Sequence, residues 1–119
     1  MIYYNKNKKV ILSMLLIMLN ITFLFAQTII EGNVIDFQTN RSLKDVTLTL
    51  ENETHSNNKQ VVVSNDKGEF LFNVDFPKGT YLLTVSAINY ETKKNRIFIN
   101  EDKKIRIDFV LTPINLEYF

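Results

Sequence analysis

The chain has 119 residues, of which 45% are hydrophobic and 23% are charged, a composition typical of a single globular domain. It contains no cysteine, which excludes disulfide bonds, thiol chemistry and a lipidated cysteine anchor. With 14 basic and 13 acidic residues, the charge is nearly balanced, so the composition gives no reason to expect binding to nucleic acid or to an anionic lipid surface.

Residues 1–26 have the composition of a secretory signal peptide. Lys6, Lys8 and Lys9 form a positive region, the 16 residues from Val10 to Phe25 are mostly apolar, and Ala26 is a small residue at the expected cleavage site. A transmembrane anchor is the alternative, but it needs about 20 apolar residues. We therefore expect export, cleavage after Ala26, and a mature chain without a stable membrane span in the periplasm, at the outer membrane, or secreted.

Apolar and polar residues alternate along nearly all of the remaining chain, without an amphipathic helix pattern. The apolar sets, in chain order, are Ile30, Gly32 and Val34; Val46, Leu48 and Leu50; Val61, Val62 and Val63; Phe70, Phe72 and Val74; Tyr81, Leu83, Val85 and Ala87; Ile97 and Ile99; and Ile105, Ile107, Phe109 and Leu111. Because each strand has one apolar face, two sheets must stack. We predict a small all-β, seven-stranded antiparallel β-sandwich over residues 27–113, followed by a tail at residues 114–119.

The acidic corner at residues 65–69 raises the question of a metal site. A calcium loop needs several converging carboxylates or carbonyls, and Asp66 and Glu69 are too few. A type I turn followed by Gly68 in the left-handed region accounts for the same residue types. In such a turn, the side chain of Asp66 or Asn65 accepts hydrogen bonds from backbone N–H groups. We therefore interpret Asp66 and Gly68 as turn residues and predict no metal.

A second corner, FPKG at residues 76–79, separates two further apolar runs. Pro77 presets the backbone angle φ that a tight turn requires, and Gly79 lets the chain enter the next strand. We interpret Pro77 and Gly79 as structural turn residues, with no role in chemistry.

Several spaced residues follow one another in a recognisable order. They are Gly32 and Val34; Leu43 and Val46; Asp66, Gly68 and Phe70; Gly79, Tyr81, Leu83 and Val85; Asn89 and Tyr90; and Phe109, Leu111 and Pro113. This pattern resembles that of the carboxypeptidase regulatory-like domain over essentially the whole mature chain. Asn89 and Ser42 stand where the family usually has glycine and proline, but asparagine tolerates left-handed backbone better than most residues.

The resemblance implies a prealbumin-like sandwich, similar to transthyretin, that serves as an accessory domain on peptidases. It also implies the N-terminal domain of TonB-dependent outer-membrane transporters, which continue into a plug and a barrel where this sequence ends at Phe119. The peptidases carry their catalytic zinc domain in a separate part of the chain. We therefore expect an exported, non-catalytic accessory or interaction module, with a fragment or remnant of a transporter as the alternative.

The sequence offers no catalytic set. A hydrolase triad needs a base held beside a nucleophile by an orienting group, and the lone histidine, His55, lies beside Ser56 in a polar loop. The carboxylates are scattered along the predicted solvent-exposed faces and turns, without an obvious pair for general acid and base catalysis. We therefore predict no enzyme activity, no catalytic residue, no bound cofactor and no metal ligand.

Four basic residues are candidates for an interaction surface. Lys94, Arg96, Lys104 and Arg106 alternate against the apolar residues of the last predicted hairpin, so several of them are expected to share one wet face. The same basic residues could instead serve solubility and protect a sheet edge from pairing with other chains. We favour that interpretation because the acidic residues between them weaken the positive field.

Two aromatic residues near predicted loops, Tyr90 and Phe76, are candidates for stacking on a sugar ring, which would make the chain a carbohydrate-binding module. Such residues more often plug the ends of a sandwich. An outermost strand is also able to recruit another chain by edge pairing. We expect the partner to be another envelope protein or a glycan, and no residue identifies it further.

Overall fold

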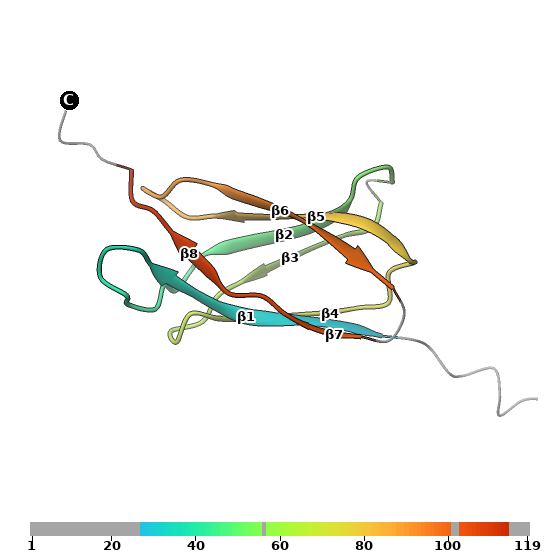
Figure 1. Cartoon of the computed structure of the whole chain (residues 1–119), viewed down its shortest axis with the longest axis horizontal. Coiled ribbons are helices and arrows are strands. Elements are labelled where there is room, and N and C mark those ends of the chain that lie inside the picture. The colour runs from blue at the N-terminus through green and yellow to red at the C-terminus, as the bar shows by residue number, and fades with distance from the viewer. Residues whose placement is uncertain (1–26, 56, 101–102, 115–119) are drawn as a thin grey trace, which may run out of the picture.

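The computed structural model describes residues 27–55, 57–100 and 103–114, and this part of the chain is all-β, with eight strands in two stacked layers and no helix (Figure 1). The predicted signal peptide and residues 115–119 of the predicted tail lie outside the described residues. The strands are β1 (Thr28–Asp36), β2 (Thr47–Asn52), β3 (Lys59–Val63), β4 (Glu69–Val74), β5 (Gly79–Ser86), β6 (Lys93–Ile99), β7 (Lys104–Arg106) and β8 (Phe109–Leu111).

The two sheets differ in strand direction. One sheet has the order β4-β1-β7, with β8 also paired to β1, and the other has the order β3-β2-β5-β6. β4 is antiparallel to β1, whereas β7 and β8 are both parallel to it. All pairs in the second sheet are antiparallel. β1 therefore holds the first sheet together, because it is paired along both of its edges.

The predicted all-β, two-sheet sandwich is confirmed, but seven antiparallel strands was wrong in strand number and direction. The expected last strand, residues 105–111, is split into β7 and β8 by Ile107 and Asp108. It is parallel to β1 because the chain crosses from β6 in one sheet to β7 in the other, instead of turning back beside β6. The prediction missed this crossing because it treated neighbouring apolar runs as hairpins.

The core consists of the alternate apolar side chains that face between the sheets. Phe72 on β4 is fully buried, and its ring meets that of Phe70 edge to face, with centroids 6.1 Å apart. Of the apolar sets predicted from the alternation, Ala87, Ile105 and Ile107 are only half-buried, and Val61 and Val63 are exposed. The buried hydrophobic residues are Ile30, Val34, Val46, Leu48, Leu50, Phe70, Phe72, Val74, Tyr81, Leu83, Val85, Ile97, Ile99, Phe109 and Leu111.

The break between β7 and β8 is fitted to a glycine in β1. A Cβ atom placed on Gly32 would lie 1.7 Å from the backbone oxygen of Ile107, so no larger residue fits without moving the backbone. The Ile107 N–H donates to the Glu31 carbonyl at 2.9 Å. The next β1 donor, the Asn33 N–H, bonds to the side-chain Oδ1 of Asp108 at 2.9 Å. A carboxylate thus takes the place of a strand carbonyl at the break.

We predict that Phe72→Ala lowers the free energy of unfolding by about 3–5 kcal/mol, because it empties a large aromatic site in the core. Urea unfolding of the purified protein measures the loss. The matched control is Leu71→Ala on the same strand, where the side chain is 52% exposed and the expected loss is below about 1 kcal/mol. A loss for Phe72→Ala as small as that of the control would contradict the packing described here.

We predict that Gly32→Ala destabilises the protein by about 1–3 kcal/mol, because the added methyl group forces β7 and β8 away from β1. The control is Asn33→Ala, which keeps the backbone N–H that bonds to Asp108. Thermal unfolding compares the two variants. Equal stability of Gly32→Ala and the wild-type protein would show that the contact with Ile107 is not tight.

Candidate interaction surface

The four basic residues predicted as an interaction surface are divided between the two sheets. Lys94 and Arg96 point outward from β6, and Lys104 and Arg106 point outward from β7. β6 pairs with β5, and β7 pairs with β1 in the other sheet. The four residues therefore do not lie on one hairpin and do not share one sheet face.

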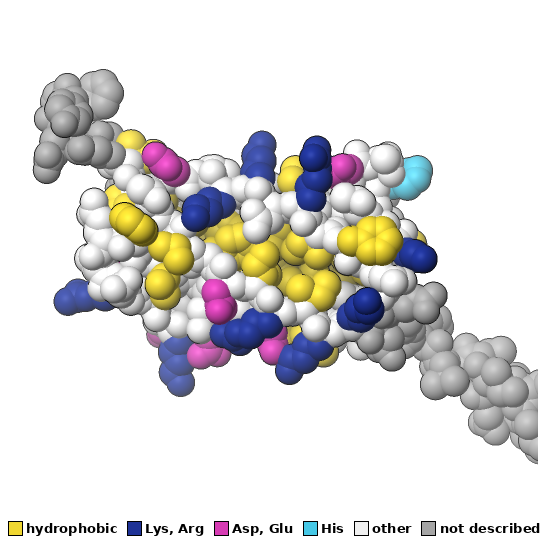
Figure 2. All heavy atoms as spheres, in the orientation of Figure 1, with side chains coloured by type: hydrophobic (Ala, Val, Ile, Leu, Met, Phe, Trp, Pro, Cys, Tyr) yellow, Lys and Arg dark blue, Asp and Glu magenta, His cyan; other side chains and the backbone are white. Residues whose placement is uncertain are grey.

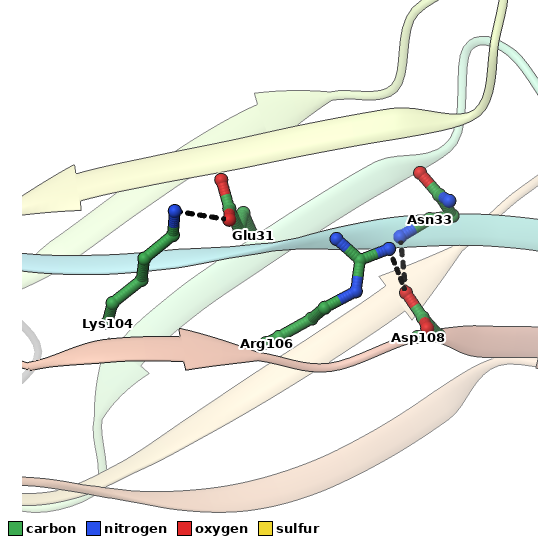
Figure 3. Close-up of polar contacts among 5 residues, drawn as sticks. All are labelled: Glu31, Asn33, Lys104, Arg106 and Asp108. Carbon is green, nitrogen blue, oxygen red and sulfur yellow. Dashed lines mark hydrogen bonds and ion pairs between the residues drawn. The ribbon is translucent and has the colours of Figure 1, made fainter.

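Ion pairs neutralise part of this charge (Figure 3). On the outer face of the sheet that contains β1, Lys104 Nζ lies 3.0 Å from Glu31 Oε1 and Arg106 Nη2 lies 3.2 Å from Asp108 Oδ1. On the other sheet, the Arg96 side chain, 76% exposed, is paired with Glu53. Exposed pairs of this kind contribute roughly 0–1 kcal/mol each, so they add little to the stability of the fold.

A groove of about 500 Å³ lies over the outer face of β4 and β1 and reaches the corner between β3 and β4. Two of its charged residues, Glu31 and Arg106, are already in ion pairs. The described residues contain no group of three or more histidines and carboxylates placed to hold a metal ion. The groove therefore presents mixed charge on an open surface. It is lined by Glu31, Gly32, Asn33, Val62, Val63, Asn65, Glu69, Phe70, Leu71 and Arg106.

Tyr90 holds together one end of the sandwich. Its hydroxyl donates to Asp36 Oδ2 at 2.5 Å, and Asp36 Oδ1 accepts the N–H groups of Gln38 and Thr39 at 2.7 and 2.9 Å. The hydrogen bond from Tyr90 and those from the backbone lower the pKa of Asp36, because they stabilise its charged form. The same carboxylate raises the pKa of Tyr90. Asn89, the residue before Tyr90, has a left-handed φ of 70°, a conformation that asparagine tolerates better than most residues.

Phe76 packs at another edge of the core. Its ring is stacked on that of Tyr81, with centroids 5.3 Å apart and planes 9° from parallel. The Tyr81 hydroxyl donates to the Pro77 carbonyl at 2.7 Å, which ties the turn to the core. Phe76 and Tyr90 are both half-buried, so each of the two predicted sugar-stacking residues already has a partner inside the protein.

The corner at residues 65–69 is a turn that the side chain of Asn65 stabilises. Asn65 Oδ1 accepts the N–H groups of Lys67 and Glu69 at 3.0 and 2.9 Å. Gly68 has a φ of 73°, and a Cβ there would lie 2.6 Å from the Val34 carbonyl oxygen. Of the two acceptors left open by the sequence, Asn65 thus fills the role, while Asp66 is exposed.

Two residues of this arrangement were missed by the sequence analysis, Asp36 and Asp108. For Asp36 a local signal existed, since an aspartate at the end of an apolar run, followed by a turn, commonly accepts backbone N–H groups two or three residues later. No local signal existed for Asp108, because the N–H that it accepts belongs to Asn33, 75 residues away.

The match to a family model agrees with this geometry. The model of the carboxypeptidase regulatory-like domain matches residues 29–112, so the chain belongs to that family. This confirms the resemblance that the spaced residues indicated. A search of curated proteins gives no significant match. No helix of the described residues is long and apolar enough to cross a membrane.

Solved structures with this fold include parts of larger proteins. The chain matches the Bacillus anthracis TIE protein at a TM-score of 0.58 and 16% identity, over 74% of this chain and 17% of that one. It matches BcpA, the major pilin subunit of Bacillus cereus, at 0.58 and 16%, over 74% and 30%. The match to catechol 1,2 dioxygenase of Acinetobacter radioresistens has a TM-score of 0.63 and 10% identity, over 77% and 53%. At these identities the matches show the fold alone.

We predict that Tyr90→Phe raises the pKa of Asp36 toward its ordinary value of 3.8, because the main hydrogen bond to the carboxylate is lost. In the wild-type protein the lowered pKa contributes stability above the unfolded-state value, and this contribution is lost as the pH falls through the folded-state pKa. The stability advantage over Tyr90→Phe should therefore be constant near neutral pH and shrink below pH 3.8.

Carboxyl NMR titration and urea unfolding at several pH values measure both effects. Tyr81→Phe is the matched control, because its hydroxyl bonds to the Pro77 carbonyl and does not contact Asp36. An Asp36 pKa that is the same in Tyr90→Phe and in the wild-type protein would refute the assignment.

Proposed function

We propose that this chain is an exported, non-catalytic interaction module of the cell envelope. Its family supplies accessory domains, and several of the polar and aromatic side chains considered for binding or chemistry hold the sandwich together. That engagement carries the proposal: Tyr90 is bonded to Asp36, Phe76 is stacked on Tyr81, and Asp108 bonds to the β1 backbone. His55, the candidate base considered from the sequence, lies on an exposed loop.

The size of the module relative to other proteins supports the same proposal. The chain spans 17% of the TIE protein and 30% of BcpA, so this sandwich occurs there as one part of a longer polypeptide. An interaction role needs only a stable surface and open strand edges, both of which a small sandwich supplies.

The alternative is the N-terminal domain of a TonB-dependent transporter, which the family membership favours as a second context. The two proposals differ in the sequence that the gene encodes after Phe119. A reading frame that continues into a plug and a barrel would replace the free-standing module with the transporter domain.

The proposal predicts that the tagged full-length chain, crosslinked inside its own cells, is recovered from the envelope fraction with a reproducible set of envelope proteins. Mass spectrometry identifies them. The control is Leu15→Arg with Leu16→Arg, which places charge in the apolar leader segment and should abolish both export and capture. Cytosolic wild-type protein, or hydrolysis of peptides or glycosides by the purified protein, would contradict the proposal.

A further inference from the structure

β6 has a long, uninterrupted edge that is not paired with another strand, and it is longer than either of the strands β7 and β8 on the same side of the sandwich. It is the outermost strand of its sheet and pairs with β5 over all seven residues, Lys93–Ile99. The facing edge of the other sheet consists of β7 and β8, which are three residues each and separated by the break at Asp108. Short and interrupted edges are poor templates for another strand, whereas a long regular edge is a good one.

The sandwich is open beside β6. Figure 2 shows apolar side chains of the interior uncovered between β6 and the β7–β8 edge, with basic side chains on both sides. On the inward row of β6, Asn95 is exposed and Lys93 only half-buried, although their cross-strand neighbours Leu83 and Val85 are completely buried. The interior beside this half of β6 is therefore less covered than the interior beside Ile97 and Ile99, which are both buried.

The inner wall of this opening is apolar. Ile97 lies 8% exposed on β6, and Ile105 and Ile107 on the opposite edge are half-buried. A strand added to the free edge of β6 would direct every second side chain toward these isoleucines, because side chains alternate between the two faces of a sheet. An apolar residue at alternate positions of that strand would complete the core.

The charge on β6 indicates which strand fits. Lys94 and Arg96 lie on its outer face. Arg96 shares its charge with Glu53, and within the described residues neither Lys93 nor Lys94 has an ion-pair partner. A second copy paired through β6 would bring its own Lys94 and Arg96 beside these residues, and like charges on neighbouring strands are destabilising. A strand with carboxylates on its outer face would instead be attracted.

We propose that β6 binds an extended segment of another protein by strand addition, and that this segment alternates apolar with acidic residues. The segment's backbone pairs with the free edge of β6, its apolar side chains cover Ile105 and Ile107, and its carboxylates lie beside Lys94 and Arg96. Backbone pairing supplies affinity in this mode of recognition, and the alternate side chains supply selectivity. The inference rests on the proposed interaction function and specifies its site.

The test uses a fluorescent nine-residue peptide that alternates valine with glutamate, and protein obtained by expressing the whole 119-residue chain. Fluorescence anisotropy measures affinity, and amide chemical shifts locate the site. The control peptides alternate valine with lysine or carry N-methyl groups on every amide, which removes the donors for strand pairing. We expect the valine–glutamate peptide to bind at β6 and both control peptides to bind at least about tenfold more weakly.

The protein variants form a matched pair with the same change in net charge. Lys94→Glu with Arg96→Glu should weaken binding about tenfold, whereas Lys59→Glu with Lys67→Glu, on β3 and on the turn, should change it less than about twofold. Equal effects of the two double variants, equal binding of the N-methylated peptide, shifts located away from β6, or no binding would each overturn the inference. So would a wild-type dimer paired through β6 in sedimentation and NMR measurements.

The two proposals fail in different ways. Capture of envelope proteins in cells together with no peptide binding at β6 would retain the interaction function and remove this site. Peptide binding at β6 together with a cytosolic protein would retain the site and remove the envelope function.

Discussion

The structure depends on the contact between β1 and the broken strand formed by β7 and β8. β1 is paired on both edges, and Gly32 allows the Ile107 carbonyl to approach where any side chain would collide with it. Asp108 then supplies the acceptor for the Asn33 N–H. This carboxylate keeps the Asn33 N–H hydrogen-bonded at the point where the regular pairing between β1 and the last strands is interrupted.

The same use of polar groups recurs where strands end. Asp36, the last residue of β1, accepts three hydrogen bonds through its carboxylate. The side chain of Asn65 accepts two before β4, and Ser64 links the end of β3 to the residue before β2 by accepting the Val46 N–H at 3.0 Å. These side chains accept hydrogen bonds from backbone N–H groups and from a hydroxyl group that have no acceptor in the pairing between strands. In a small domain without disulfides, such bonds fix the positions of the turns while the apolar core provides most of the stability.

The sequence was sufficient for features that depend on local patterns. Period-two alternation predicted the buried side chains of β2, β4 and β5, and the glycine of the NDKG corner predicted its left-handed turn. The parallel pairing of β7 and β8 could not be predicted from the alternation, which is the same for parallel and antiparallel neighbours. The Tyr90–Asp36 bond joins residues 54 positions apart, and a separation of that size leaves no local pattern.

The parallel pairing of the first and last strands also determines how the domain responds to tension. Because β1 and β8 run in the same direction, the chain enters the sandwich at one end and leaves at the opposite end (Figure 1). A force that pulls these ends apart would slide β1 along β7 and β8, so their hydrogen bonds bear the load together and do not open one at a time. Such a geometry resists stretching along the direction of β1.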